Sequence, residues 1–234
     1  MPLKNSLLRN SLLAIFVAVY CLGLFAYGNG QKGLTNTFVL AAVTNGLVVG
    51  QVYFWIQFAL YKRYQFIFLI LSSALYIWAY QTLLPYLWFW LFLLLQLILA
   101  SQYERGAKWR QIPFLKNFLL PCMWFIQLNF IPAMLGSWSL FNVAFLVFYL
   151  ALSLQADLED IDEDSGKITT LVGLLGAKQA GFLIVFLFSF ASFLLGLPWV
   201  WIMLALLVMR RELHLPKRSY DALLLVLGVY FLLR

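Results

Sequence analysis

Six of the nine acidic residues of this chain lie within eight positions, from Asp157 to Asp164, in a sequence that is otherwise apolar. If the preceding helix continues past Ala156, the spacing D-x-x-D-x-x-x-D places Asp157, Asp160 and Asp164 within an arc of about 60°. Carboxylates stacked on successive turns repel one another, so this arrangement requires a compensating cation. Mg²⁺ is the expected cation, because it is commonly held by one or two carboxylates together with substrate phosphates. The alternative is an acidic loop that faces water.

Long apolar runs flank this acidic segment on both sides. Of the 234 residues, 64% are hydrophobic and 11% are charged, and the mean hydropathy is +0.90. This composition exceeds what one soluble core needs, and it predicts an all-α, polytopic membrane protein with a single domain over residues 1–234. Breaks at charged residues, Pro and Gly predict about nine membrane-spanning helices. The expected ranges are 7–27, 36–60, 65–83, 86–102, 114–134, 138–156, 178–196, 198–209 and 219–233.

Lysine and arginine residues alternate between the two sides of this predicted layout. Fourteen fall on one side, and only Lys32 and Arg234 fall on the other. By the positive-inside rule the crowded side is cytoplasmic, and it holds the amino terminus and the acidic segment. We therefore expect a multi-pass protein of a bacterial inner membrane. The net charge of +7 is explained by orientation and by attraction to the anionic lipid bilayer, and it does not indicate a nucleic-acid partner.

Few other residues offer metal-binding or redox chemistry. Cys21 and Cys122 lie inside apolar runs, where thiols are expected to be buried and to form neither a disulfide nor a metal site. The single histidine, His214, lies among basic residues without a Cys or His neighbour, so it is a poor candidate for a metal ligand.

Two stretches of the chain carry a family resemblance. Residues 157–176 read DLEDIDEDSGKITTLVGLLG and resemble the second aspartate-rich motif of the UbiA-type intramembrane prenyltransferases. Residues 103–117 read YERGAKWRQIPFLKN and resemble that family's loop between helices four and five. The resemblance implies a nine-helix bundle with both loops on the cytoplasmic face. It also implies transfer of a prenyl group from a prenyl diphosphate to an acceptor, often aromatic, with Mg²⁺ held by Asp157, Asp160 and Asp164.

The resemblance also implies the residues that bind the diphosphate. A departing diphosphate must be met by metal and by fixed cations. Lys108 is the closest match to the family's loop lysine and is therefore the expected catalytic residue. The expected diphosphate contacts are Arg105, Lys108, Arg110, Lys116, Lys62 and Arg63.

The family's first aspartate-rich motif has no counterpart in this chain. The corresponding residues 45–63 read NGLVVGQVYFWIQFALYKR and contain no carboxylate. Two interpretations follow: Lys62 and Arg63 replace the missing charge in an active enzyme, or the chain is a non-catalytic homologue that binds an isoprenoid lipid or acts as a membrane scaffold. The candidates for lining a substrate cavity are Asn45, Gln57, Tyr61, Tyr103 and Asp221.

Overall fold

The computed structural model describes the greater part of the chain, and most of the described residues are helical. The described residues are 2–29, 36–57, 70, 74–104, 114–135, 142–159, 161, 170–197 and 221–233. These residues form no strand, which confirms the all-α prediction for this part of the chain. The packing divides the chain into two compact units, which we describe separately. Unit 1 contains Met1–Glu104, Phe130–Phe141 and Asp221–Arg234, and unit 2 contains Arg105–Asn129 and Asn142–Tyr220.

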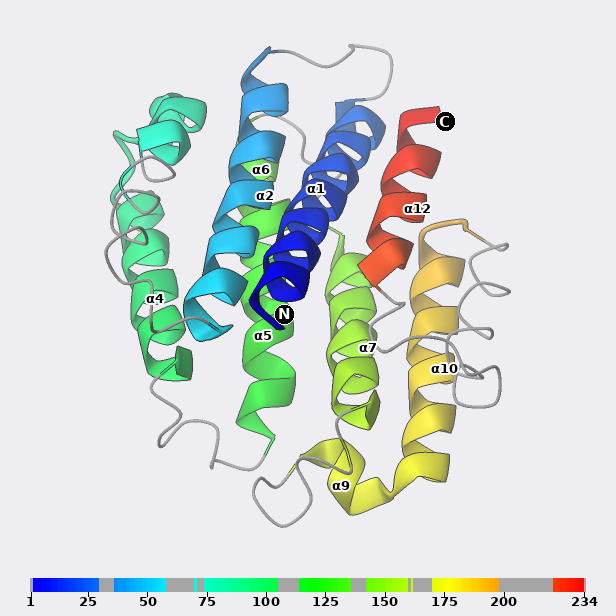
Figure 1. Ribbon diagram of the computed structural model, residues 1–234. Helices are drawn as coiled ribbons and strands as arrows, with labels where there is room; N and C mark the ends of the chain where they lie inside the picture. The colour runs from blue at the N-terminus through cyan, green and yellow to red at the C-terminus, as the bar shows by residue number, and fades with distance from the viewer. Residues whose placement is uncertain are drawn as a thin grey trace. The chain divides into compact units, whose positions relative to one another are not determined.

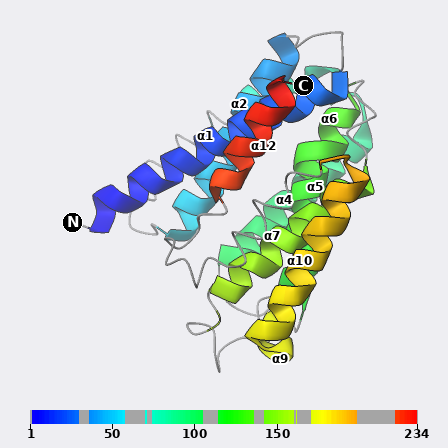
Figure 2. The ribbon, with the colours of Figure 1, turned by 90° about the vertical axis from the view of Figure 1, so that its right-hand side faces the viewer.

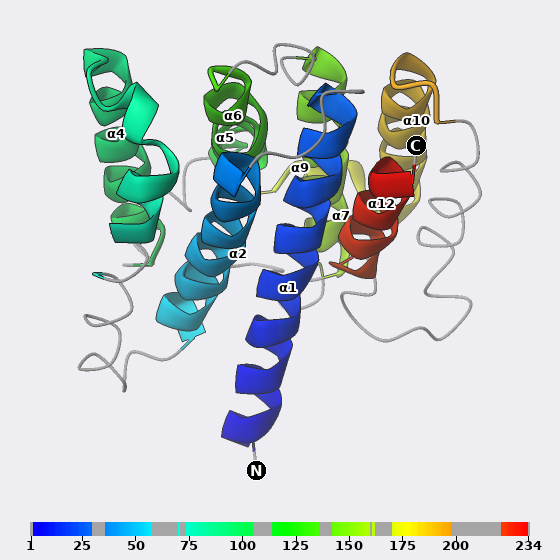
Figure 3. The ribbon, with the colours of Figure 1, turned by 90° about the horizontal axis from the view of Figure 1, so that it is seen from above.

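The centre of unit 1 is a layer of three helices. Helix α1 (Pro2–Asn29) lies between α2 (Asn36–Gln57) and α12 (Asp221–Leu233), as Figures 1 and 3 show. Aromatic contacts join the helices near the end of α1, where Phe25 packs on Phe38 and Tyr27 on Phe231. The two ends of this unit's sequence are therefore neighbours in the fold.

Glycines bring these three helices unusually close together. A Cβ added at Gly228 would lie 2.6 Å from the carbonyl oxygen of Val19 and 2.7 Å from the amide nitrogen of Tyr20. A Cβ added at Gly23 would collide with the carbonyl oxygen of Gly228, and one added at Gly46 would lie 2.5 Å from that of Ala14. Small residues at such crossings let backbones approach, which is typical of helices that pack inside membranes.

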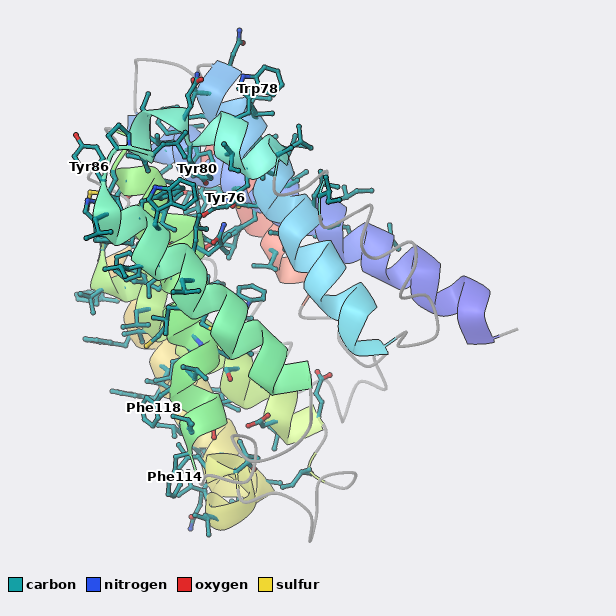
Figure 4. All side chains as sticks on the ribbon, turned by 90° about the vertical axis from the view of Figure 1, so that its left-hand side faces the viewer. Tyr76, Trp78, Tyr80, Tyr86, Phe114 and Phe118 are labelled. Atoms are coloured by element: carbon teal, nitrogen blue, oxygen red, sulfur yellow. The ribbon has the colours of Figure 1, made fainter. Side chains whose placement is uncertain are left out.

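A cluster of aromatic side chains forms another part of the core of unit 1. A helical turn at 74–79 and the 3₁₀ helix η3 (Gln81–Leu83) precede α4 (Leu87–Glu104). The ring centroid of Tyr76 lies 4.6 Å from that of Tyr80 and 6.0 Å from that of Phe89, on which Tyr76 stacks. The side chain of Trp78, in contrast, is 61% exposed. Figure 4 shows Tyr76 and Tyr80 close together and Trp78 apart from them.

A polar contact anchors this cluster to α2. Nδ2 of Asn45 donates a hydrogen bond to the hydroxyl of Tyr80 over 3.3 Å and lies 3.9 Å from Sγ of Cys21. All three side chains are fully buried. Polar side chains that pair between helices stabilise membrane bundles, and this contact joins α1, α2 and the 74–83 segment.

Tyr80→Phe is expected to destabilise the protein modestly, because it removes the hydroxyl that accepts from Asn45. The expected loss in the free energy of unfolding is about 0.6 kcal/mol, and no more than about 1.7 kcal/mol. Unfolding in mixed detergent micelles would measure it. Tyr86→Phe is the control, since Tyr86 is 51% exposed. Equal losses in both variants would contradict the Asn45 contact.

Unit 2 is built around α7. Helix α7 (Val143–Glu159) packs against both α5 (Leu115–Phe125) and α10 (Ala177–Leu194), as Figure 1 shows. The short helix α9 (Leu171–Leu175) lies at the start of α10 (Figure 2). Between them Gly176 adopts a φ of 77°, a left-handed value that favours glycine.

Helix α5 is followed directly by a turn of the wider π-helix. Residues Ile126–Phe130 form a π-helical turn, η4, which is followed by α6 (Ile131–Ala133) in unit 1. Pro132 has no N–H to donate to the carbonyl of Leu128, so the regular α-helical bonding cannot continue through this point. The wider turn is the local response to that missing donor.

Helix α10 is the one helix within the described residues that is long and apolar enough to cross a membrane, judged by length and composition alone. Its 18 residues would extend about 27 Å. Its outward stripe consists of large aromatic residues that are 45% to 75% exposed: Phe182, Phe186, Phe190 and Phe193. The described residues also contain three shorter apolar helices, Leu12–Gly28, Asn117–Ala133 and Leu224–Leu233. The length and apolar composition of α10 are an indication of membrane association.

The observed helices follow the predicted ranges closely, with two corrections. Helix α4 continues to Glu104, so Tyr103 lies in a helix and not in the loop that follows. Cys122 is exposed on α5, whereas the sequence predicted a buried thiol; Cys21 is buried as expected. The predicted helix 198–209 lies outside the described residues.

Candidate functional site

The first aspartate of the acidic segment is buried in unit 2. Helix α7 continues past Ala156 to Glu159, which confirms the predicted helical extension over these residues. Asp157 is therefore on the last turn of α7 and is only 1% exposed. Burial of a carboxylate is costly unless polar partners accompany it. The structure supplies such a partner from α5.

Asn117 is that partner, and it links three helices. Its Nδ2 donates a hydrogen bond to Oδ2 of Asp157 over 2.6 Å. Its Oδ1 accepts a hydrogen bond from the backbone N–H of Leu171, the first residue of α9, over 3.2 Å. Because one end of the amide must donate and the other accept, the two contacts together define its orientation. The side chain of Asn117 is completely buried.

The residue that precedes helix α9 also stabilises the start of this helix. Thr170 precedes it in an extended conformation, and its Oγ1 accepts a hydrogen bond from the N–H of Gly173 over 3.0 Å. This is the usual N-capping arrangement, which satisfies amides that have no partner inside the helix. With Asn117 on Leu171 and Thr170 on Gly173, two N–H groups of the first turn are satisfied by side chains.

A second polar contact joins the π-helical turn after α5 to an earlier part of α7. The hydroxyl of Tyr149 donates a hydrogen bond to Oδ1 of Asn129 over 2.7 Å. Asn129 lies in the π-helical turn η4, and both residues are buried. Two asparagines of the same helical segment thus bind two polar groups of α7.

Buried polar atoms without partners lie near the end of α7. Among the described residues, Oγ of Ser153 and Oε1 of Gln155 form no hydrogen bond, although the side chains are only 6% and 3% exposed. Ser153 precedes Asp157 by four residues, so both lie on the same face of α7. Buried orphan oxygens call for a bound ion or an ordered water. The oxygen donors here are of the kind that Mg²⁺ prefers.

Most of the predicted site residues lie outside the described part of the chain. In the described part, no three His, Cys, Asp or Glu residues come together. The predicted stripe of three carboxylates is therefore represented by Asp157 alone. The residues that lie outside are Asp160, Asp164, Tyr61, Lys62, Arg63, Arg105, Lys108 and Arg110. Four others are described only by their backbone: Gln57 ends α2, Tyr103 lies in α4, Lys116 lies in the first turn of α5 and Asp221 begins α12.

Asn45 lies in unit 1, where it contacts Tyr80 and Cys21. Its expected place beside a substrate cavity stays a prediction.

The sequence did not reveal the role of Asn117. It is the last residue of the stretch that resembles a family loop, and it is not among the predicted site residues. One local signal was available: Asn117 follows Lys116 at the start of an apolar run, where an amide is uncommon. Its neighbour Phe118 is 55% exposed and lies on the outside of α5 (Figure 4).

Comparison with protein-family models, with curated proteins and with solved structures finds no match to this chain.

Proposed function

We propose that this chain is a UbiA-like integral membrane prenyltransferase homologue that binds a prenyl diphosphate with Mg²⁺ at its acidic segment. In this proposal it is a multi-pass bundle of about nine spans in a bacterial inner membrane, with a cytoplasmic amino terminus. One observation carries the proposal. The two stretches that resemble the family meet in unit 2, where Asn117 of one bonds both Asp157 and Leu171 of the other.

The roles of the residues follow from the charge of the ligand. Mg²⁺ would neutralise part of the diphosphate and so favour its departure. Asp157 would hold the ion together with Asp160 and Asp164, and the hydroxyl of Ser153 is a further oxygen on the same face. Lys108 would contact the diphosphate as catalytic residue, with Arg105, Arg110, Lys116, Lys62 and Arg63 around it.

A second candidate function is that of a non-catalytic homologue which binds an isoprenoid lipid. The absence of carboxylates from residues 45–63 favours it. So does Asn45, which pairs with Tyr80 inside unit 1 in the way that a structural residue does. Binding without turnover would distinguish this function from catalysis.

The proposed function predicts a ligand-dependent gain in stability. Mg²⁺ with a non-hydrolysable prenyl diphosphate should raise the thermal midpoint of the detergent-solubilised protein. At a ligand concentration 100 times Kd the gain corresponds to about 2.7 kcal/mol. The double variant Asp157→Asn/Asp160→Asn should abolish this gain.

Each outcome of this experiment has a distinct meaning. No shift in the wild type would contradict the proposed binding site altogether. A shift without product from any aromatic acceptor would favour the non-catalytic homologue. Mg²⁺ alone and inorganic diphosphate with Mg²⁺ are the controls that separate binding of the ion and of the headgroup from recognition of the prenyl chain.

A further inference from the structure

We propose that Asn117 is a positioning residue that orients the carboxylate of Asp157 for the Mg²⁺ and diphosphate site. This inference rests on the proposed function and adds to it a residue that neither touches the ion nor carries charge. It starts from the two hydrogen bonds of one buried side chain, to Oδ2 of Asp157 at 2.6 Å and from the N–H of Leu171 at 3.2 Å.

The geometry restricts the carboxylate strongly. An aspartate side chain on the last turn of a helix can adopt more than one χ1 rotamer and a broad range of χ2 unless a contact holds it. The donor Nδ2 of Asn117 holds Oδ2, so the position of this carboxylate oxygen is restrained relative to α5. Asn117 cannot turn over, because its Oδ1 accepts from a backbone amide that has no second orientation. The direction of the carboxylate is therefore tied to the start of α9.

The uncharged amide of Asn117 is also compatible with the binding of a cation at Asp157. A lysine or arginine at position 117 would neutralise Asp157 and compete with the ion. An apolar residue would remove this donor from the buried carboxylate, which is unfavourable. Asparagine provides one donor and one acceptor without net charge, so its contact with Asp157 does not itself neutralise the carboxylate. Groups of this kind around metal sites orient the ligating side chain.

The test is a titration of Mg²⁺ into the detergent-solubilised full chain at a fixed, saturating concentration of a non-hydrolysable prenyl diphosphate. The readout is the Mg²⁺ concentration that gives half of the shift in thermal midpoint. Asn117→Leu has similar volume and lacks both hydrogen bonds. It is expected to raise this concentration about 10- to 100-fold.

Asn129→Leu is the matched control. Asn129 is an equally buried asparagine of the same helical segment, and its 2.7 Å bond goes to Tyr149, not to Asp157. The control should lower the thermal midpoint without ligand, as Asn117→Leu does, but it should leave the half-maximal Mg²⁺ concentration unchanged. A merely structural role of Asn117 would make the two variants alike.

The outcomes separate this inference from the function on which it rests. A wild type without any shift overturns both. A wild-type shift with the same half-maximal Mg²⁺ concentration in Asn117→Leu overturns the positioning role alone, and so does an equal rise in the Asn129→Leu control. If Asn117→Leu does not accumulate, Asn117→Ser replaces it. The serine hydroxyl is too short to reach both partners, so the same rise is expected, and an unchanged concentration overturns the inference.

Discussion

Gly228→Ala is expected to lower the free energy of unfolding by about 1 to 3 kcal/mol, which is the usual cost of inserting a methyl group into a filled interior. The added Cβ would lie within 2.7 Å of backbone atoms of Val19 and Tyr20. Backbone atoms in the middle of a helix cannot turn aside as a flexible side chain can, so α1 and α12 must separate. Gly228→Leu should have a larger effect and should prevent the two helices from packing. Unfolding in mixed micelles and the yield of monodisperse protein would measure both variants.

Gly173→Ala is the matched control for this prediction. A Cβ at position 173 would meet only Oγ1 of Thr170, at 3.3 Å, and the residue is exposed on α9. The side-chain oxygen of Thr170 must move by a few tenths of an ångström, but alanine is the better helix former, so the control should cost much less than Gly228→Ala. If Gly228→Ala and Gly173→Ala behave alike, the close approach of α1 and α12 is wrong.

Phe186→Arg is the prediction that tests the membrane assignment most directly. Phe186 lies at the middle of α10, is 63% exposed and stacks on Phe190 at 6.2 Å. If α10 spans a bilayer, an arginine at its centre should add about 2.5 to 3.5 kcal/mol to the free energy of insertion. On the surface of a soluble protein the same exchange is usually within about 0.5 kcal/mol of neutral. The expected free-energy cost of Phe186→Arg is therefore severalfold larger in a bilayer than on the surface of a soluble protein.

The measurement is the fraction of chains in which α10 is inserted, read from glycosylation acceptor sites placed before and after it. Phe193→Arg is the control, because Phe193 lies next to the end of α10 and is 75% exposed. An arginine there can extend its charge toward the interface and should cost much less. Equal insertion of Phe186→Arg and wild type would contradict a spanning α10.

Two means hold the helices of this protein together, close backbone contact at glycines and hydrogen bonds between buried polar side chains, and unit 1 also uses the second, through Asn45 and Tyr80. In unit 1 the crossings at Gly23, Gly46 and Gly228 rely on the absence of side chains. In unit 2 the contacts of Asn117 with Asp157 and of Asn129 with Tyr149 rely on hydrogen bonds between buried polar groups. Both are ways of joining helices where apolar burial alone gives little preference for one partner over another. The buried carboxylate belongs to the second kind, and it is the feature that links the packing of unit 2 to the proposed site.

The sequence by itself determined where the described helices lie and that one of them continues into the first residues of the acidic segment, as far as Glu159. Hydropathy and the breaks at charged residues placed α1, α2, α4, α5, α7, α10 and α12 closely, because these signals are local and each depends on a short window of residues. The extension of α7 to Glu159 followed from the absence of Gly and Pro, which is also local. A proline shortly before Asp157 would have predicted an earlier end for this helix.

The tertiary structure decided which polar and small residues are partners. Asn117 bonds Asp157 across 40 positions and Leu171 across 54, and Gly23 meets Gly228 from opposite ends of the chain. Nothing within a short window specifies such pairs, because a side chain's partner is set by which helices become neighbours and in what register. The isolated asparagine at the start of an apolar run is a local sign of a polar contact, but it does not identify the partner. Only the packing of α5 against α7 and α9 showed that the partner is the carboxylate on which the proposed chemistry depends.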